Sequence, residues 1–292
     1  MKELKLKQCR LDERYDILDC LGRGSYSEIY SARDNSAATD ATHRVVVIKA
    51  LNVALQGSAD ADLERTLLEN FQNEAVALDR VRHPHIISRL GHGSAIDLNG
   101  TVFHYIVLEF LSGGDLGAIC RRSPLPLDQM LFYVEQVSAG LAYAHERGVI
   151  HRDIKPQNLL LTADGQTVKI ADFGVAKIEA GDGAITRVGT NVYAPPEHSP
   201  LSATGALDDV TGLGPGRQLT PAADIYSLAK TVYTLLAGVS PRQYSHRQII
   251  GLPVELSDHH WSEAVLRVLN RATFDDPARR YQTVQEFWDE LS

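Results

Sequence analysis

The sequence has little that would support disulfides, a zinc site or nucleic-acid binding. Its 292 residues include only three cysteines, Cys9, Cys20 and Cys120, which lie far apart and form no C-x-x-C pair. We therefore expect neither a disulfide framework nor a zinc site, and a reducing, cytoplasmic setting fits best. The formal net charge is −8, whereas a nucleic-acid-binding domain usually presents a basic face.

Long apolar runs and a signal-like start are also absent. No apolar run approaches the roughly 18 residues that a membrane-spanning helix needs, and the first residues alternate Lys and Leu. We expect no membrane span in this chain, whether it is a complete protein or a fragment of a longer one. Apolar residues make up 44% and charged residues 23%, which is typical of a globular protein. The length suffices for two lobes with cores of their own.

The most informative stretch runs from Val149 to Gly174. Two short apolar runs, 158–162 and 167–171, flank the turn Ala163-Asp164-Gly165 and predict a small hairpin. A hairpin brings its outer ends together, so the polar residues before and after it are expected to converge on one site.

Those outer ends carry a set of side chains suited to a metal ion. Asp153 and Asn158 lie before the hairpin, and Asp172 follows it. Mg²⁺ prefers a few hard oxygen ligands from the protein and fills its other positions with water and phosphate. One carboxylate and the amide can bind the metal, which leaves the other carboxylate to orient a hydroxyl group.

Residues 151–158 read H-R-D-I-K-P-Q-N and residues 172–174 read D-F-G. This pattern resembles the catalytic core of eukaryotic-type protein kinases, and most closely that of bacterial Ser/Thr members. The resemblance implies an α+β, bilobal fold. Its small N-lobe is mostly antiparallel β-sheet with one main helix, and its larger C-lobe is mainly helical. We expect an N-terminal lead-in over 1–13, poorly ordered, then the N-lobe over 14–110 and the C-lobe over 111–292.

A glycine turn near the N-terminus fits the same family. The stretch from Tyr15 predicts two strands around Gly22 and Gly24, whose lack of a Cβ lets backbone N–H groups approach phosphate. An ordinary hairpin turn is the alternative for such a short pattern. Ser27 stands where the family has its third glycine.

A lysine inside an apolar strand is the next signal. Lys49 interrupts the β-branched run 44–51, and burial of its ammonium is costly unless it meets an anion. A surface lysine on an edge strand is the alternative. In the family, the matching lysine contacts the ATP phosphates and a glutamate of the following helix. The spacing of apolar residues predicts that helix over 60–80. Glu64, Glu69 or Glu74 could make that contact. The resemblance favours Glu74.

The resemblance assigns the adenine pocket and places the hinge at Glu109 to Leu111, whose backbone would hydrogen-bond adenine. We expect strands near 86–92 and 102–110, with Leu108 as gatekeeper. Arg89 falls where the family prefers an apolar residue, and a shift by one position to Leu90 is the alternative alignment. The implied ATP-binding residues are Leu21, Gly22, Gly24, Ser27, Ile29, Val47, Lys49, Glu74, Leu108, Glu109, Leu111 and Leu160.

The resemblance also assigns catalytic and metal-binding roles. Asn158 and Asp172 would hold Mg²⁺, for which Mn²⁺ can substitute, and Lys155 would steady the γ-phosphate. Asp153 would orient the substrate hydroxyl and accept its proton.

Several residues are expected to support the C-lobe. Glu197, in A-P-P-E, would form a buried ion pair with Arg280, and Asp224 would brace the catalytic loop. A core helix is expected over 128–147 with Asp128 as its N-cap, and another over 224–238 ended by Gly238. The segment 199–219 reads as a flexible insertion, with a docking surface as the alternative.

The segment between D-F-G and A-P-P-E carries the regulatory candidates. A phosphate on Thr186 would pair with Arg152 and Lys177 and order the segment. An exposed threonine without a regulatory role is the alternative. Thr190 would contact Asp153 and Lys155 and shape the acceptor site.

Every residue of the family's phosphoryl-transfer set is present, so we expect an ATP-dependent Ser/Thr protein kinase that phosphorylates protein substrates in signalling and also itself. Lys155, two residues after Asp153, is typical of Ser/Thr-specific catalytic loops. The alternatives are a pseudokinase that serves as a nucleotide-binding scaffold, and a kinase of small molecules.

Overall fold

The computed structural model describes residues 3–6, 9–37, 44–57, 61–173, 192–198 and 220–292. The chain divides into two compact units. Within the described ranges, the N-terminal unit comprises residues up to 82 together with 87–111. The C-terminal unit comprises 83–86 and the described residues from 112 onward.

The N-terminal unit is built on a six-stranded antiparallel sheet with the order β1-β2-β3-β4-β6-β5. In β4 every second residue is buried in the core, which is the pattern of a strand with two different faces. The edge strand β5 begins at Arg89, three residues later than the predicted stretch 86–92. The strands are β1 Arg10–Leu11, β2 Tyr15–Arg23, β3 Ser27–Asp34, β4 Val45–Leu51, β5 Arg89–Ile96 and β6 Val102–Glu109.

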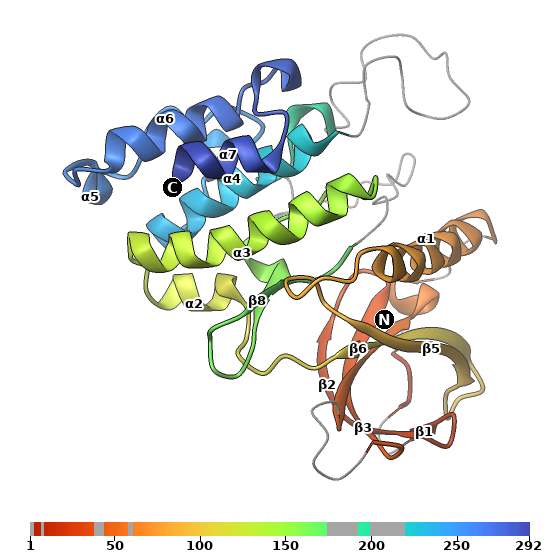
Figure 1. The fold of residues 1–292 in the computed structure, drawn as a ribbon. Helices are drawn as coiled ribbons and strands as arrows, with labels where there is room; N and C mark the ends of the chain where they lie inside the picture. Colours follow the sequence, from red (N-terminus) through yellow and green to blue (C-terminus); the bar gives the residue numbers. More distant parts are fainter. Residues whose placement is uncertain (1–2, 7–8, 38–43, 58–60, 174–191, 199–219) are drawn as a thin grey trace. The chain divides into compact units, whose positions relative to one another are not determined.

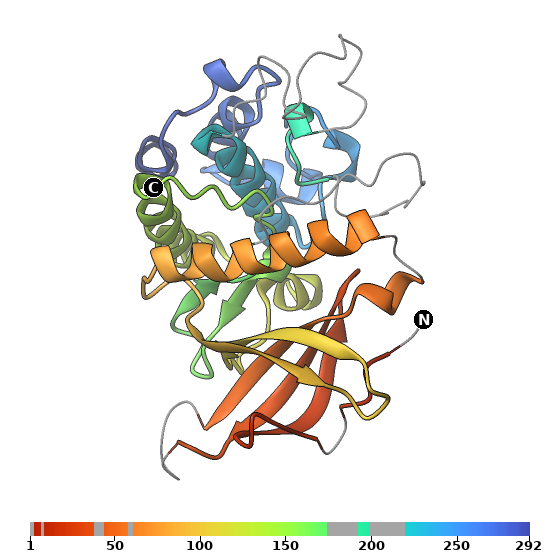
Figure 2. The ribbon, with the colours of Figure 1, turned by 90° about the vertical axis from the view of Figure 1, so that its right-hand side faces the viewer.

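One long helix, α1 (Ala61–Arg80), accompanies this sheet after the short 3-10 turn η1 (Val53–Gln56). Figure 2 shows α1, in orange, running beside β5 of its own unit. Its buried residues Leu67, Phe71, Glu74 and Leu78 recur every three to four positions, so one stripe of the helix packs inward. The predicted helix over 60–80 is confirmed.

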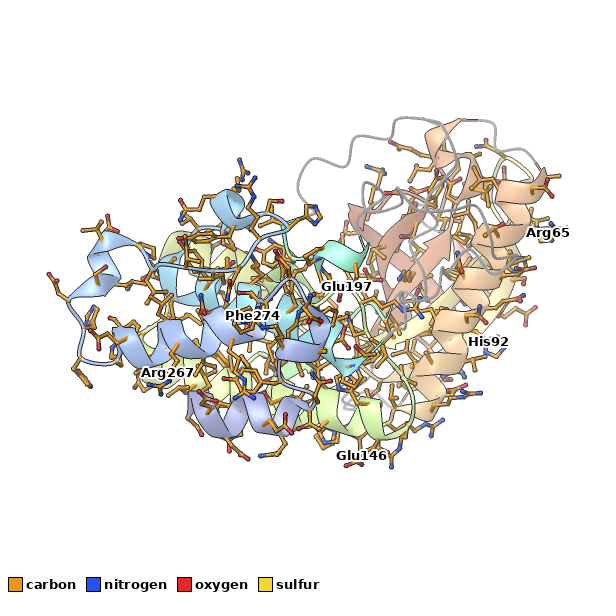
Figure 3. All side chains as sticks on the ribbon, turned by 90° about the horizontal axis from the view of Figure 1, so that it is seen from above. Arg65, His92, Glu146, Glu197, Arg267 and Phe274 are labelled. Atoms are coloured by element: carbon orange, nitrogen blue, oxygen red, sulfur yellow. The ribbon has the colours of Figure 1, made fainter. Side chains whose placement is uncertain are left out.

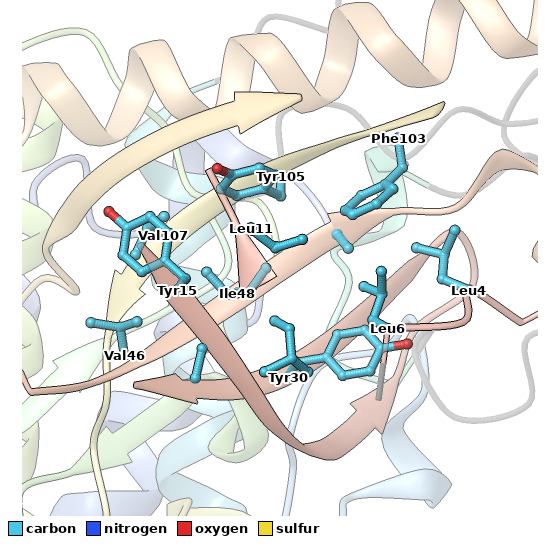
Figure 4. Packing of buried hydrophobic residues seen from close by; sticks show 13 residues of the cluster. Leu4, Leu6, Leu11, Tyr15, Tyr30, Val46, Ile48, Phe103, Tyr105 and Val107 are labelled. Carbon is cyan, nitrogen blue, oxygen red and sulfur yellow. The ribbon is translucent and has the colours of Figure 1, made fainter. Parts of the chain in front are cut away.

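The N-terminal segment corrects the prediction of a poorly ordered lead-in. Leu4 and Leu6 are buried, in one cluster with Tyr30, Ile48 and Phe103 (Figure 4). The Lys-Leu alternation puts both leucines on one side of an extended chain, where they cover the apolar face of the sheet. The expectation is therefore wrong for residues 3–6 and 9–13.

The C-terminal unit is mainly helical around α4, whose residues 222–236 are all buried. Helices α2, α3, α6 and α7 contact α4 (Figure 1). Gly238 ends α4 with a left-handed φ of 68°, as predicted. The helices are α2 Leu116–Arg122, α3 Leu127–Glu146, α4 Pro221–Ala237, α5 Val254–Ser257, α6 Ser262–Ala272 and α7 Val284–Leu291. The 3-10 turns are η2 Pro156–Asn158, η3 Pro196–His198, η5 Arg242–Tyr244 and η6 Pro277–Arg279.

One detail of this unit corrects a prediction. Helix α3 has Pro126 rather than Asp128 as its N-cap, and Asp128 lies in the first turn, where a carboxylate complements the helix dipole.

Among the residues that the structure describes, no helix is long and apolar enough to cross a membrane.

An ion pair joins η3 to the loop after α6. Arg280 donates from Nη1 and Nη2 to the two carboxylate oxygens of Glu197, at 2.7 and 2.8 Å. Its Nε donates to the carbonyl oxygen of Phe274 at 2.7 Å, and Figure 3 labels both Glu197 and Phe274 in this part of the unit. The Arg280 side chain is fully buried, so these partners replace the water that the guanidinium loses.

Removal of this arginine should destabilise the unit strongly. We predict that Arg280→Met lowers the free energy of unfolding by about 3–5 kcal/mol, because Glu197 and the backbone carbonyls lose their partner. The matched control is Arg267→Met on α6 (Figure 3), an exposed arginine that should change the free energy by less than about 0.5 kcal/mol. Denaturant unfolding of both variants tests this, and equal losses would contradict it.

Candidate active site

One face of the N-terminal sheet collects several predicted ATP-binding residues. Antiparallel pairing places Ile29 opposite Lys49, and Val47 opposite Leu108. Directly paired residues point to the same side of a sheet, so these four share one face. The alternate residues, among them Ile48, point into the apolar core on the other face.

Lys49 is fixed on this face by an ion pair. Its Nζ lies 2.6 and 2.8 Å from the two carboxylate oxygens of Glu74. Glu74 belongs to the buried stripe of α1, whereas Glu64 and Glu69 lie on exposed positions of the helix. Both partners are largely buried, so the charge-assisted bonds hold the ammonium in one position.

The glycine turn closes the hairpin of β2 and β3. Gly24 N–H donates to the Ser27 carbonyl at 2.8 Å. A Cβ on Gly24 would approach the Ser27 hydroxyl oxygen to 2.9 Å, so a larger residue there would have to displace the Ser27 side chain. At Gly22 a Cβ would meet nothing within 4 Å. Leu21, just before it on β2, is exposed.

The predicted hinge is tied back to the start of β5. Glu109 accepts from the Ser88 amide at 2.6 Å through its side chain, and its own amide donates to the Ser88 carbonyl at 3.0 Å. The Glu109 amide N–H is therefore already hydrogen-bonded within the N-terminal unit. Leu111, the last residue of the predicted hinge, is half-buried.

The start of β5 does not support the alternative alignment that shifts Arg89 by one position to Leu90. Leu90 is exposed, so it does not supply the apolar contact. Instead, Arg89 binds the carboxylate of Asp79 on α1 with two nitrogens, Nε at 3.0 Å and Nη2 in a shorter contact. A polar pair therefore links α1 and β5 where the family has an apolar contact.

In the C-terminal unit, the predicted hairpin is confirmed by antiparallel pairing of β7 (Leu159–Leu161) with β8 (Val168–Ile170). The loop before it brings together three predicted residues. Lys155 Nζ donates to Asp153 Oδ2 at 2.8 Å. Asn158 Nδ2 donates to the Asp153 carbonyl at 2.8 Å and to its Oδ2 at 3.2 Å.

Asp224 on α4 holds the backbone of this loop. Its carboxylate accepts from the amides of His151 at 2.8 Å and Arg152 at 2.7 Å. His145 Nε2 lies 2.8 Å from the same carboxylate. Arg152 has a left-handed φ of 69°, which costs a non-glycine residue about 1 kcal/mol or more. The carboxylate thus stabilises a turn that the chain would not adopt alone.

Burial acts to raise the pKa of Asp224, but the bonds from His145 and the loop hold its pKa below the usual value. A depressed pKa means that this carboxylate stabilises the fold above its unfolded pKa, near 4. That contribution is lost as the pH falls through the folded pKa.

His151 links the loop to the segment that carries Asp172. Asp153 N–H donates to His151 Nδ1 at 3.2 Å, so Nε2 is the ring donor to the Ala171 carbonyl at 3.0 Å. The ring also meets the Phe173 ring edge-on, with the centroids 4.6 Å apart. No role was assigned to His145 or His151 from the sequence, although the place of His151 at the start of the H-R-D motif was a usable signal.

The donor atoms present fit Mg²⁺. Because the Asn158 amide nitrogen is directed at Asp153, its carbonyl oxygen is the atom left for a metal. Asp172 is exposed, with a left-handed φ of 63°. No group of three His, Cys, Asp or Glu residues that could hold a metal occurs in the described part of the chain. An amide and a carboxylate suit a cation that keeps water and phosphate as its other ligands.

Three predicted residues, Lys177, Thr186 and Thr190, lie outside the described residues, as does the segment 199–219. Leu160 is half-buried on β7, and its backbone bridges to Asp115. The roles of these residues stay predictions.

Residues 15–289 match the family model described as the protein kinase domain. The chain belongs to the protein kinase family. Its two units are therefore the N-lobe and the C-lobe of this α+β fold. Among the solved structures, the PknI kinase domain of Mycobacterium tuberculosis is similar, with a TM-score of 0.67, 26% identity, and coverage of 98% of this chain and 97% of that one.

Curated relatives of this kinase domain come from bacteria and beyond. The serine/threonine-protein kinase pkn3 of Myxococcus xanthus is 32% identical over 295 residues, 95% of this chain and 49% of that protein. PknB of Mycobacterium leprae is 29% identical, over 96% of this chain and 43% of that protein. The chain thus spans less than half the length of these relatives.

The Lys49–Glu74 pair makes a matched test possible on one helix of the kinase domain. We predict that Glu74→Gln lowers kcat/KM for ATP about tenfold to a hundredfold, because the ammonium loses its charged anchor. Glu69→Gln, on the exposed side of α1, should stay within about twofold. Steady-state kinetics at varied ATP concentration measure both. Equal effects of the two substitutions would show that the pair does not position Lys49.

Proposed function

We propose that this kinase domain is an ATP-dependent Ser/Thr protein kinase. The observation that supports this most is the catalytic loop. Lys155 and Asn158 both donate hydrogen bonds to the Asp153 carboxylate, and Asp224 holds the loop backbone through its amides. The relatives named serine/threonine-protein kinases agree with it.

The proposed reaction transfers the γ-phosphate of ATP to a protein hydroxyl. The substrate hydroxyl oxygen forms a bond to the γ-phosphorus as the bond to the β-phosphate oxygen breaks, and ADP leaves. Asp153 orients the hydroxyl and takes its proton, which then passes to solvent. Lys49 contacts the α- and β-phosphates, and Lys155 steadies the γ-phosphate.

Asn158 and Asp172 would hold Mg²⁺ or Mn²⁺, which when bound neutralises phosphate charge as the bond to the leaving group breaks. The N-lobe residues of the predicted ATP site would hold the adenine and phosphates. Glu109 and Leu111 would contact adenine through the backbone, the Glu109 amide excepted because Ser88 accepts from it.

A Ser/Thr acceptor is favoured over Tyr by Lys155, and by Thr190, which would shape a site for a short hydroxyl side chain. A pseudokinase scaffold is disfavoured because no member of the phosphoryl-transfer set is missing from the sequence. A small-molecule kinase is disfavoured because the protein-kinase segment that ends in A-P-P-E is present, and its Glu197 pairs with Arg280.

Regulation by autophosphorylation at Thr186 belongs to the same proposal. Arg152 Nε is buried and has no hydrogen-bond partner among the described residues. A phosphate carrying about −1.5 to −2 charge would supply one for Arg152 and for Lys177. We also propose a cytoplasmic signalling role, with protein substrates and no nucleic-acid partner.

The transfer reaction is tested with the purified chain, radiolabelled ATP, and Mg²⁺ or Mn²⁺. We predict label on serine or threonine, of the chain itself or of a general protein substrate, by phosphoamino-acid analysis. Asp153→Asn should lower transfer by at least about a thousandfold while nucleotide binding persists, because the hydroxyl loses its proton acceptor. The control is Asp164→Asn in the β7–β8 turn, an exposed aspartate that should leave the rate within about twofold.

Two results would overturn the proposal. A wild type that binds nucleotide but labels nothing, itself included, would favour the pseudokinase scaffold. Label found mainly on tyrosine would refute the assigned acceptor.

A further inference from the structure

A fully buried glutamate lies beside the glycine turn of the N-lobe. Glu28 on β3 has no exposed surface, and a buried carboxylate is costly unless hydrogen bonds replace its water. Its Oε1 accepts from Leu4 N at 2.9 Å and from Asn52 Nδ2 at 2.6 Å. Its Oε2 accepts from the Tyr30 hydroxyl at 2.8 Å and from Arg23 Nε at 3.4 Å.

These donors come from separate parts of the lobe. Leu4 belongs to the N-terminal segment, and Asn52 follows the end of β4, three residues after Lys49. Arg23 lies between Gly22 and Gly24 and is paired with Glu28 across the hairpin. One carboxylate therefore joins the glycine turn to the N-terminal segment and to the strand that carries Lys49.

Glu28 lies on the sheet face opposite the predicted nucleotide site. Side chains alternate along β3, so Glu28 and Tyr30 point toward the core while Ile29 points to the other face. Figure 4 shows Leu4 and Leu6 beside Tyr30 in the cluster that covers the core face. Glu28 would therefore act on nucleotide binding through the turn, without contact to the nucleotide.

The N-terminal segment holds the turn at a second point. Arg23 Nη2 lies 3.0 Å from Glu3 Oε2. Lys5 N–H donates to Asp97 Oδ2 at 3.0 Å, which fastens the segment at the end of β5. Because the segment also excludes water from Glu28, the hydrogen bonds of this carboxylate are stronger than those of an exposed one.

We propose that Glu28 is a positioning residue for ATP binding, which sets the Gly22-Arg23-Gly24 turn through Arg23 before the nucleotide arrives. The inference rests on the proposed function and adds a residue that its mechanism does not name. A turn with two glycines has wide conformational freedom, and a ligand that must order it binds more weakly. The anchored arginine removes part of that cost.

Glu28→Gln and Tyr30→Phe form a matched pair of variants. Glutamine keeps a carbonyl oxygen for Leu4 and Asn52, but it turns an amide N–H₂ toward the donor Arg23 Nε. Tyr30→Phe removes one hydrogen bond to the same carboxylate and leaves the contact with the turn intact. We expect Glu28→Gln to raise the Kd and KM for Mg-ATP about fivefold, with kcat within about twofold. Tyr30→Phe should leave all three unchanged, although both variants lower the Tm.

Arg23→Met carries the test independently, because its side chain is nearly half exposed and its loss does not threaten folding. If Arg23 acts through Glu28, this variant and the double variant with Glu28→Gln should show the same rise in Kd, without addition. If Arg23 instead contacts phosphate directly, Arg23→Met weakens binding while Glu28→Gln does not, which overturns the proposal.

Direct nucleotide titration separates this inference from the proposed function. A wild type that binds Mg-ATP but transfers no phosphate would refute kinase activity, while the Kd values of the variants still decide the role of Glu28. Equal Kd values in wild type, Glu28→Gln and Arg23→Met would overturn the inference. So would a wild type that binds no nucleotide.

Discussion

The catalytic loop of this kinase domain depends on one buried carboxylate. Asp224 is completely buried on the central helix α4, and its oxygens accept from the amides of His151 and Arg152. These bonds hold Arg152 in a left-handed conformation, so the next residue, Asp153, is presented to Lys155 and Asn158. An isolated buried charge would be unfavourable by several kcal/mol. Here the two loop amides and His145 replace the water that the carboxylate loses, so its charge fixes the loop geometry and also stabilises the fold above its unfolded pKa.

In the N-lobe, two further buried carboxylates each hold a group in place. The Glu74 carboxylate holds the ammonium of Lys49, and Glu28 holds the turn between the two glycines. In each case a mostly buried anion fixes a flexible group that is expected to meet phosphate. Electrostatic groups stabilise a reaction best when they are in position before it starts. Apolar packing of α1 and β3 positions these anions.

Local patterns in the sequence sufficed for the parts of the site that neighbouring residues define. The hairpin after Asn158 follows from two short apolar runs and a glycine turn, and the choice of Glu74 agrees with its place on the buried stripe of α1. The helix over 224–238 was expected in the core from its many apolar residues, and Gly238 marked its end.

The missed features depend on partners distant in sequence. Leu4 and Leu6 belong to the Lys-Leu alternation that was expected to be a poorly ordered lead-in, and their burial depends on Tyr30 and Phe103, which no local pattern connects to them. No local pattern indicated the burial of Glu28, because three of its four donors are supplied by other segments of the lobe.

The partner of Arg89 also could not be predicted from neighbouring residues. The family pattern called for an apolar residue at this position, whereas Arg89 is accommodated by Asp79, which the packing of α1 on the sheet brings to it. Long-range contacts of this kind become visible only once the lobe is assembled.

The most direct test of this account is the turnover number of Asp224→Asn, measured beside its affinity for Mg-ATP. Asparagine keeps the shape but replaces one acceptor oxygen with an N–H₂ group that faces a loop amide. The account predicts a fall in kcat of at least about a hundredfold with the Kd for Mg-ATP within about threefold, because the loop rather than the N-lobe is disturbed. A folded variant with an unchanged kcat would contradict it.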